Sequence, residues 1–299
     1  QQFGWRSIFL LNVPFILLSF ALCVGNIPGH SVRRHLRLDY PGWLLMVSGL
    51  VPLLLWASFV ARWGWLSLPS LVTLGIAILL LAAFVRVERR TQQPLIDFSV
   101  LREKTFRRAC GLSVLLAIFY CVAFMLMPFR LIELYALNDA QLGLMLLPVT
   151  LVMALVSPLA GRLGDRLGPW PIMASGFTLL AASALLQSTF SSTQSVYWVI
   201  TAFVLMGMGW GAILGPSVAA ALGALPPSQH GQGIGISWTL HNLGGALGLA
   251  VATRLYQAGG AVQGYQWVMC LLAVLSVVGM ITAAISIRRA SPASAGAGE

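Results

Sequence analysis

Long apolar runs, separated by short polar segments, follow one another along almost the whole chain. A helix needs about 20 mainly apolar residues to cross the hydrocarbon core of a bilayer. By this measure we expect nine spanning helices, at residues 7–25, 42–61, 66–85, 109–128, 141–160, 171–188, 196–217, 234–256 and 266–287. The pattern therefore predicts an all-α, polytopic bundle of transmembrane helices.

Two segments lie outside these runs. Residues 92–106, QQPLIDFSVLREKTF, carry Pro94 near their start, and proline suits the first turn of a helix. The apolar side chains of this segment can share one helix face, opposite the charges: Leu95, Phe98 and Leu101. We expect a short interfacial helix on the cytoplasmic membrane surface. The tail, 290–299, is small and polar, and we expect it to be disordered.

Composition supports a membrane protein. Of the 299 residues, 58% are hydrophobic and 9% are charged, whereas a soluble domain carries roughly 25% charged residues. The net charge of +10 raises the question of a nucleic-acid partner. The basic residues are scattered over short loops and form no continuous patch, so we expect the lipid bilayer and not nucleic acid as the partner.

The basic residues also predict the orientation. If the first loop, 26–41, is cytoplasmic, fourteen Lys and Arg lie on the inner side, and four lie on the outer side: Arg6, Arg62, Arg130 and Arg254. The positive-inside rule then places the C-terminus in the cytoplasm. We expect a multi-pass protein of the cytoplasmic (inner) cell membrane.

Residues that could carry catalysis are scarce. None of the eight acidic residues falls in the middle of an expected span. The four cysteines lie singly in apolar runs, and no hydrolase elbow, P-loop or zinc motif is present. We therefore expect no enzyme, no metal site and no cofactor.

One expected span, 234–256, carries a polar and aromatic face. Trp238, His241 and Asn242 recur at helical spacing. Such a face should look at a cavity or another helix rather than at lipid. One interpretation is ligand contact, with His241 able to change its charge near neutral pH. The other is a hydrogen bond between helices, and the sequence leaves both open.

Large side chains on two further spans can line a pocket or fill the core. Tyr120, Phe124 and Met127 share one face, as do Met206 and Trp210. Glycines four residues apart predict close packing of the seventh and eighth expected spans, because small residues let backbones approach each other. These glycines are Gly207, Gly211 and Gly215 in one span and Gly244 and Gly248 in the next.

Several motifs resemble a known family. The stretch GRLGDRLG, with Gly161, Asp165, Arg166 and Gly168, resembles the cytoplasmic loop motif of the major facilitator superfamily. The motif normally continues with two basic residues, where Pro169 and Trp170 stand here. Four other stretches are similar to segments of its fourteen-helix drug/proton antiporters: GWRSIFLLNVPF at 4–15, LDYPGWLL at 38–45, VERRTQQPLIDFSVLREKTF at 87–106 and HNLGGALGLA at 241–250.

The resemblance implies a domain organisation. Residues 1–25 would be the last helix of an N-terminal bundle, and 26–108 a two-helix insertion with the interfacial helix. Residues 109–289 would be the C-terminal six-helix bundle. The rest of the N-terminal bundle, with the carboxylate that couples to protons, would precede this sequence.

The resemblance also implies a function: secondary active efflux of small amphipathic compounds by alternating access, driven by the proton gradient. Asp165 and Arg166, in a cytoplasmic turn, would latch the two bundles together. The alternative is that Arg162 and Arg166 only enforce topology while Asp165 is a solvated cap. Two other functions stay open, namely export of one dedicated metabolite and a scaffold or receptor-like protein without transport.

Overall fold

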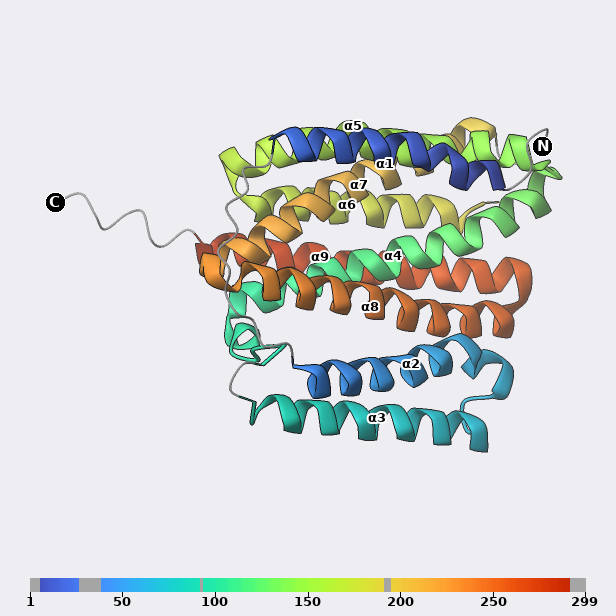
Figure 1. Cartoon of the computed structure of the whole chain (residues 1–299). Helices are drawn as coiled ribbons and strands as arrows, with labels where there is room; N and C mark the ends of the chain where they lie inside the picture. The colour runs from blue at the N-terminus through green and yellow to red at the C-terminus, as the bar shows by residue number, and fades with distance from the viewer. Residues whose placement is uncertain (1–5, 27–38, 92–93, 191–194, 291–299) are drawn as a thin grey trace. The chain divides into compact units, whose positions relative to one another are not determined.

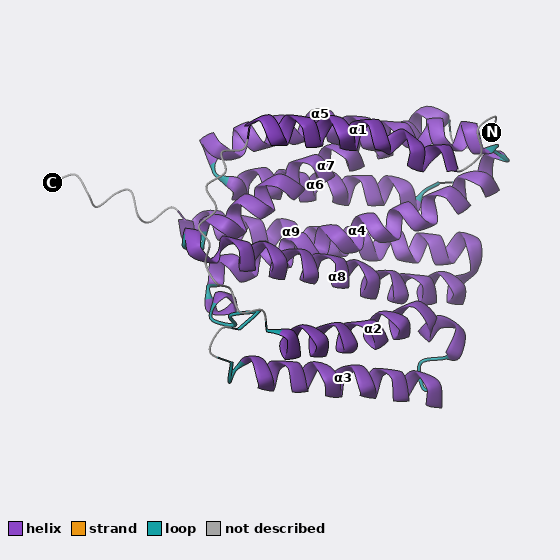
Figure 2. Ribbon diagram, viewed as in Figure 1, coloured by secondary structure: helices purple, strands orange, loops and turns teal. Residues whose placement is uncertain are grey.

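The computed structural model describes residues 6–26, 39–91, 94–190 and 195–290. These residues form helices joined by short turns and contain no strand (Figures 1 and 2), so the all-α prediction is confirmed for them. The α-helices are α1 (Arg6–Asn26), α2 (Tyr40–Trp63), α3 (Leu68–Glu88), α4 (Lys104–Tyr135), α5 (Asp139–Leu167), α6 (Pro169–Ser188), α7 (Val196–Gly223), α8 (His230–Gly259) and α9 (Tyr265–Ala290).

In the described part of the chain, seven helical stretches are long and apolar enough to cross a membrane. The expected number of nine is too high by this measure, for two reasons. The helices α8 and α9 count as one stretch, Pro227–Arg289, because a π-helical segment, Gly260–Gly264, joins them without a break. The helix α1 contributes only a shorter apolar helix, Phe9–Val24. The chain nevertheless reverses direction at the π-helical segment (Figure 1), so α8 and α9 are two separate helices.

The chain divides into two compact units, Gln1–Leu38 and Asp39–Glu299. In the first, α1 is a single apolar helix with Pro14 inside it. In the second, α2 and α3 form a helical hairpin that packs on α8, while α6 packs on α7 and α9, α5 on α7, and α4 on α8. The tail from residue 291 onwards, expected to be disordered, lies outside the described residues, and the expected domain boundaries stay predictions.

The expected interfacial helix over 92–106 is wrong where the segment is described. Residues 94–103 hold only a 3-10 turn, Val100–Arg102, and α4 already begins at Lys104. Side-chain acceptors take the backbone N–H groups here and hold the segment in turns. Asp97 accepts from the Ser99 N–H at 2.8 Å, and Glu103 accepts from the Thr105 N–H at 3.3 Å. The hydrogen bonds from Ser99 lower the pKa of Asp97 below its ordinary value.

Two carboxyl groups close the base of the α2–α3 hairpin. Asp39 caps α2, and its Oδ1 accepts from the Gly42 N–H at 2.9 Å. Glu88, with a side chain only 1% exposed, accepts from the Ile96 N–H at 2.5 Å. The other oxygens, Asp39 Oδ2 and Glu88 Oε2, are buried without a donor. Both press against Gly42, where a β-carbon would lie 2.5 Å from the first and 2.6 Å from the second.

Glycines allow four helices to approach closely. A β-carbon at Gly207 of α7 would overlap the carbonyl oxygen of Val149 on α5, and one at Gly211 would lie 2.9 Å from the Met153 carbonyl oxygen. On α8, Gly244 and Gly248 lie against side chains of α4, those of Val114 and Ile118. The predicted close packing is therefore present, but α7 uses its glycines on α5 and α8 uses its glycines on α4. Gly215 meets nothing within 4 Å.

A buried polar network joins α4, α6 and α9 at the end of the bundle opposite Arg289. Arg130, 4% exposed, donates to Glu133 at 3.0 Å and to the Phe190 carbonyl at 2.7 Å. Its guanidinium lies 5.7 Å from the centroid of the Tyr265 ring. The Tyr265 hydroxyl in turn donates to Gln187 Oε1 at 3.2 Å. The network compensates a cation that would otherwise be buried at high cost.

Gly207→Ala should destabilise the protein by about 1–3 kcal/mol, because the added methyl group forces α7 away from the α5 backbone. Gly215→Ala is the matched control on the same helix and should change stability by less than about 0.5 kcal/mol. Thermal unfolding of the detergent-solubilised protein, followed by circular dichroism, measures both. Equal melting temperatures for the two variants would contradict the α5–α7 contact.

Glu88→Gln should leave the hairpin as stable as the wild type or more stable. The amide oxygen can still accept from the Ile96 N–H, and the amide N–H supplies the donor that Asp39 Oδ2 lacks. Glu88→Ala loses both interactions and should cost about 1–3 kcal/mol. The same unfolding measurement compares them. If the glutamine variant is as unstable as the alanine variant, an ionised carboxylate at position 88 is required and the explanation is wrong.

Candidate functional site

Aromatic side chains from three helices meet in the middle of the larger unit. Tyr120 of α4 stacks on Trp210 of α7, with ring centroids 4.8 Å apart, and Phe124 meets the same indole edge-to-face at 5.5 Å. On α8, the His241 ring lies 5.7 Å from Tyr120 and 5.1 Å from Trp238. Tyr120 and Trp210 stand close to the midpoints of their helices. We name these five side chains the aromatic cluster.

Trp210 gives the aromatic cluster a free polar group. The side chain is half-buried, and its indole Nε1 is buried with no hydrogen-bond partner. Leaving a buried donor unpaired costs about 1–3 kcal/mol. The N–H group is therefore available to an acceptor that enters from outside the described chain.

His241 forms a hydrogen bond between helices. The side chain is 2% exposed, and its Nδ1 lies 2.8 Å from the Ser113 hydroxyl oxygen of α4. This contact agrees with the second of the two interpretations of the sequence. Tyr120 and Trp238 cover the ring, so contact of His241 with a ligand stays a prediction.

Trp238 and Asn242 lie at a different surface, between α8 and α2. With Leu50 and Leu54 they line a groove of about 310 Å³. Trp238 is 42% exposed, and the Asn242 amide donates to the Trp238 carbonyl at 2.8 Å. Trp238 thus connects the aromatic cluster to this groove, which α2 of the hairpin closes on one side.

Met127 and Met206 lie in the hydrophobic core. Both are fully buried, and the Met206 sulfur lies 4.0 Å from the Gln187 amide nitrogen. On each of the two helices, the large side chains therefore fall into two groups. Tyr120, Phe124 and Trp210 belong to the aromatic cluster, and the two methionines lie in the core.

The motif Gly161, Asp165, Arg166 and Gly168 has a different backbone from the one expected. The helix α5 continues to Leu167, so Asp165 lies in its last turn and not in a turn at a helix N-terminus. The helix dipole disfavours a carboxylate at that end. Gly168, with φ 83°, joins α5 directly to α6. Asp165 and Arg166 are exposed, and neither forms an ion pair within the described residues.

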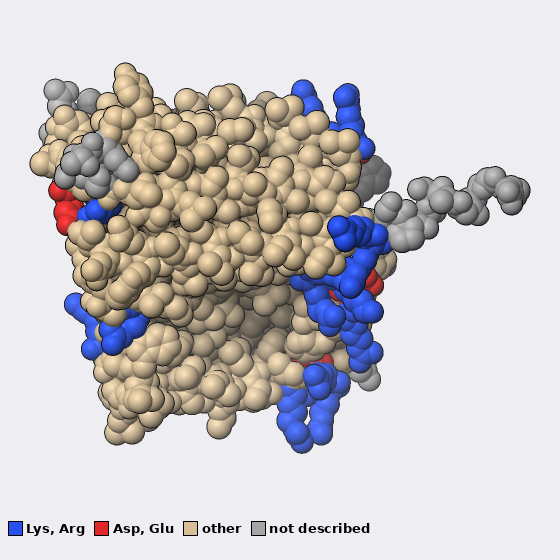
Figure 3. All heavy atoms as spheres, turned by 180° about the vertical axis from the view of Figure 1, so that it is seen from behind, with Lys and Arg blue, Asp and Glu red and all other residues tan. Residues whose placement is uncertain are grey.

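Charged side chains of the larger unit gather at its two ends. Figure 3 shows a broad band without Lys, Arg, Asp or Glu between them on the face drawn. The end with more basic residues is the one where α9 finishes at Arg288 and Arg289. This distribution suits a protein that spans a bilayer, and the cytoplasmic assignment of the more basic end stays a prediction.

Sequence reasoning missed the partners of the polar side chains. Ser113 and Gln187 were not singled out, although each forms a buried hydrogen bond with a side chain of another helix. Ser183 and Gln187, four residues apart in an apolar run, were a usable signal, because polar residues at this spacing share one face. Nothing in the sequence indicated the hydrogen-bond partner of either residue, because that partner lies far away in the chain.

The sequence profile of the Major Facilitator Superfamily matches residues 1–248 and 109–299, which together cover the chain. The chain belongs to the Major Facilitator Superfamily. It is an integral membrane protein with the helical class expected of that family. Proteins of this family are transporters and not enzymes.

Three relatives show how far the similarity extends. The uncharacterized MFS-type transporter YvkA of Bacillus subtilis is 27% identical over 282 residues, 94% of the chain and 61% of YvkA. The multidrug resistance protein Stp of Mycobacterium tuberculosis is 30% identical over 253 residues, 84% and 47% of the two chains. The riboflavin transporter RibZ of Clostridioides difficile is 28% identical over 258 residues, 86% and 55%. The chain thus spans less than two thirds of each relative.

The Ser113–His241 hydrogen bond should give a measurable coupling energy in a double-mutant cycle. Ser113→Ala removes one partner, and His241→Phe keeps the stacking while removing the other. We expect a coupling of about 0.6 kcal/mol and at most about 1.7 kcal/mol, the range found between membrane helices. Thr239→Ala, on the exposed side of α8, is the control and should be additive with His241→Phe. A coupling of zero for the first pair would contradict the bond.

Proposed function

We propose that this chain is part of an exporter that moves amphipathic compounds out of the cell against an inward flow of protons. The observation that carries the proposal is the aromatic cluster with the unpartnered indole N–H of Trp210. Family membership and the similarity to a multidrug resistance protein support it. The mechanism would be alternating access, in which two helical bundles rock around a site near the bilayer midplane.

The aromatic cluster suits ligands that differ in shape. Flat aromatic faces contribute large apolar contact areas with few directional requirements. A single donor can orient a ligand without demanding a complete set of hydrogen bonds. In this proposal Tyr120, Phe124 and Trp210 contact the substrate. His241, Trp238 and Asn242 form the neighbouring wall, and Met127 and Met206 support it from the core.

Proton coupling is not assigned to any acidic residue of this chain. The described acids stand at helix ends or in loops, among them Glu88 at the end of α3 and Glu133 in the last turn of α4. A proton relay needs an ionisable group that both sides of the membrane can reach in turn. The proposal therefore places the coupling carboxylate in a second bundle.

Asp165 and Arg166 would act at the contact between the two bundles. Both side chains are exposed at the end of α5, and leucines dominate the exposed face of that helix: Leu144, Leu147, Leu151, Leu155, Leu159, Leu163 and Leu167. Because neither charged side chain is engaged within the described chain, both are available to charges of a second bundle. Such a contact can form in one state of the cycle and break in the other.

One observation favours the alternative of a single dedicated substrate. RibZ, a riboflavin transporter, is about as similar to this chain as the multidrug resistance protein Stp is. Competition between chemically unrelated compounds for the same flux separates the two functions. A scaffold or receptor-like protein would show no flux at all.

The test is transport by the full gene product in proteoliposomes with an imposed proton gradient and a fluorescent amphipathic cation. Trp210→Phe keeps the stacking and removes the N–H, so the apparent affinity should fall about threefold to tenfold for substrates that carry an acceptor. Trp267→Phe, at a side chain 49% exposed on α9, is the matched control and should leave transport unchanged. Flux that ignores the proton gradient would refute the coupling, and equal affinities for the two variants would refute the site.

A further inference from the structure

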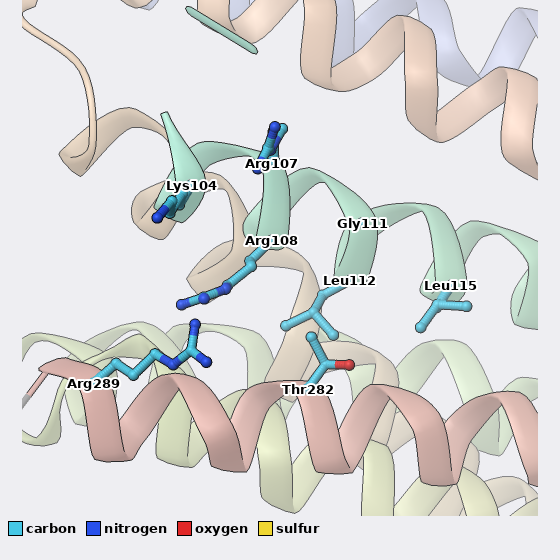
Figure 4. A pocket seen from close by; sticks show the side chains of 8 residues that line it. All are labelled: Lys104, Arg107, Arg108, Gly111, Leu112, Leu115, Thr282 and Arg289. Carbon is cyan, nitrogen blue, oxygen red and sulfur yellow. The ribbon is translucent and has the colours of Figure 1, made fainter. Parts of the chain in front are cut away.

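A second cavity lies at the basic end of the larger unit, between α4 and α9. It has a volume of about 510 Å³ and is lined by Lys104, Arg107, Arg108, Gly111, Leu112, Leu115, Thr282 and Arg289. Figure 4 shows Arg108 reaching from α4 toward α9 and Arg289 reaching back toward α4. Leu112 lies farther along α4, next to Thr282, and Leu115 follows it one turn later. The cavity thus has a cationic entrance and a mainly apolar wall.

The positive charge of this cavity is not neutralised by the described protein. Four of the lining side chains are cations and none is an acid. None of the four side chains forms an ion pair or a hydrogen bond with the residues that the structure describes. Glu103, the nearest acid in the sequence, caps α4 by accepting from the Thr105 N–H. Like charges that converge at short range repel each other unless an anion lies between them.

The helix ends increase this potential. Lys104, Arg107 and Arg108 occupy the first turns of α4, and no acidic residue stands in its first turn. A helix N-terminus carries partial positive charge and attracts anions. Arg289 is in the last turn of α9, where the dipole favours a cation. Glu103 supplies one carboxylate at this helix end, whereas three cations of α4 and Arg289 line the cavity. An anion placed between Arg108 and Arg289 would supply the remaining compensation.

The positive-inside rule explains why basic residues gather at this end, but it does not explain why four of them surround a cavity with leucines behind them. We propose that this cavity binds the phosphate headgroup of an anionic phospholipid from the adjoining leaflet. The guanidinium groups of Arg108 and Arg289 would hold the phosphate through paired hydrogen bonds. An acyl chain would lie along Leu112 and Leu115. Basic pockets between transmembrane helices are suited to such headgroups. The proposal requires a bilayer around the chain and does not depend on the transport cycle.

The test measures lipid binding to the full gene product in detergent by native mass spectrometry, with phosphatidylglycerol against phosphatidylcholine. The wild type should prefer phosphatidylglycerol. Loss of each arginine should weaken this preference roughly fivefold, so R108Q/R289Q should lose it roughly 25-fold. The control R90Q/R288Q removes two exposed cations that do not line the cavity and should keep the preference within about twofold.

Two further arms make the result decisive. R289Q alone changes an exposed residue in the last turn of α9 and keeps the test valid if the double variant does not fold. It should show the roughly fivefold loss. Inorganic phosphate and glycerol phosphate should not displace the lipid at equal concentration, because they lack the acyl chain. Full displacement by either would show a site for soluble phosphate and overturn the lipid proposal, as would an equal loss of preference in R90Q/R288Q.

Discussion

The absence of hydrogen-bond partners in the hydrocarbon core is the constraint on which the rest of this structure depends. Each backbone N–H and C=O group in that region must be satisfied by the chain itself, and a helix does this locally. Apolar side chains gain little by leaving lipid for another helix. Close packing therefore relies on glycines. Gly207 and Gly211 of α7 lie against α5, and Gly244 of α8 lies against α4. A few buried polar contacts fix which helices meet, and the Ser113–His241 pair is one of them.

The larger unit distributes its polar chemistry by depth. At one end, Arg130 and Tyr265 tie α4 to α9 and the α6–α7 connection. At the other end, basic side chains surround an open cavity whose counter-charge is not supplied by the described protein. Between them the described side chains of the core are uncharged and mainly apolar, and the aromatic cluster lies among them.

Much of this fold could be predicted from the sequence, because each apolar run reports its own helix. The run 109–128 predicted α4, although the helix extends from Lys104 to Tyr135, since polar residues continue a helix beyond the hydrocarbon. Glycine spacing predicted which faces pack closely but not their partners. The local backbone differed from the prediction in two places. Acceptor side chains broke the expected interfacial helix, and Asp165 stayed in α5 because the helix ends only at Gly168. Ser113, 128 positions from His241, gave no sign of its partner.

Trp210 Nε1 differs from the other buried polar atoms without partners because it lies far from the ends of its helix. The buried atoms without partners in the described chain are Asp39 Oδ2, Glu88 Oε2, Arg130 Nε and Trp210 Nε1. Asp39 and Glu88 lie at helix ends, and Arg130 already makes two other hydrogen bonds. Trp210 lies near the midpoint of α7, far from either end. Its indole therefore lies far from the helix ends and against the stacked ring of Tyr120. This depth is why the proposed substrate contact depends on Trp210 and not on the other three atoms.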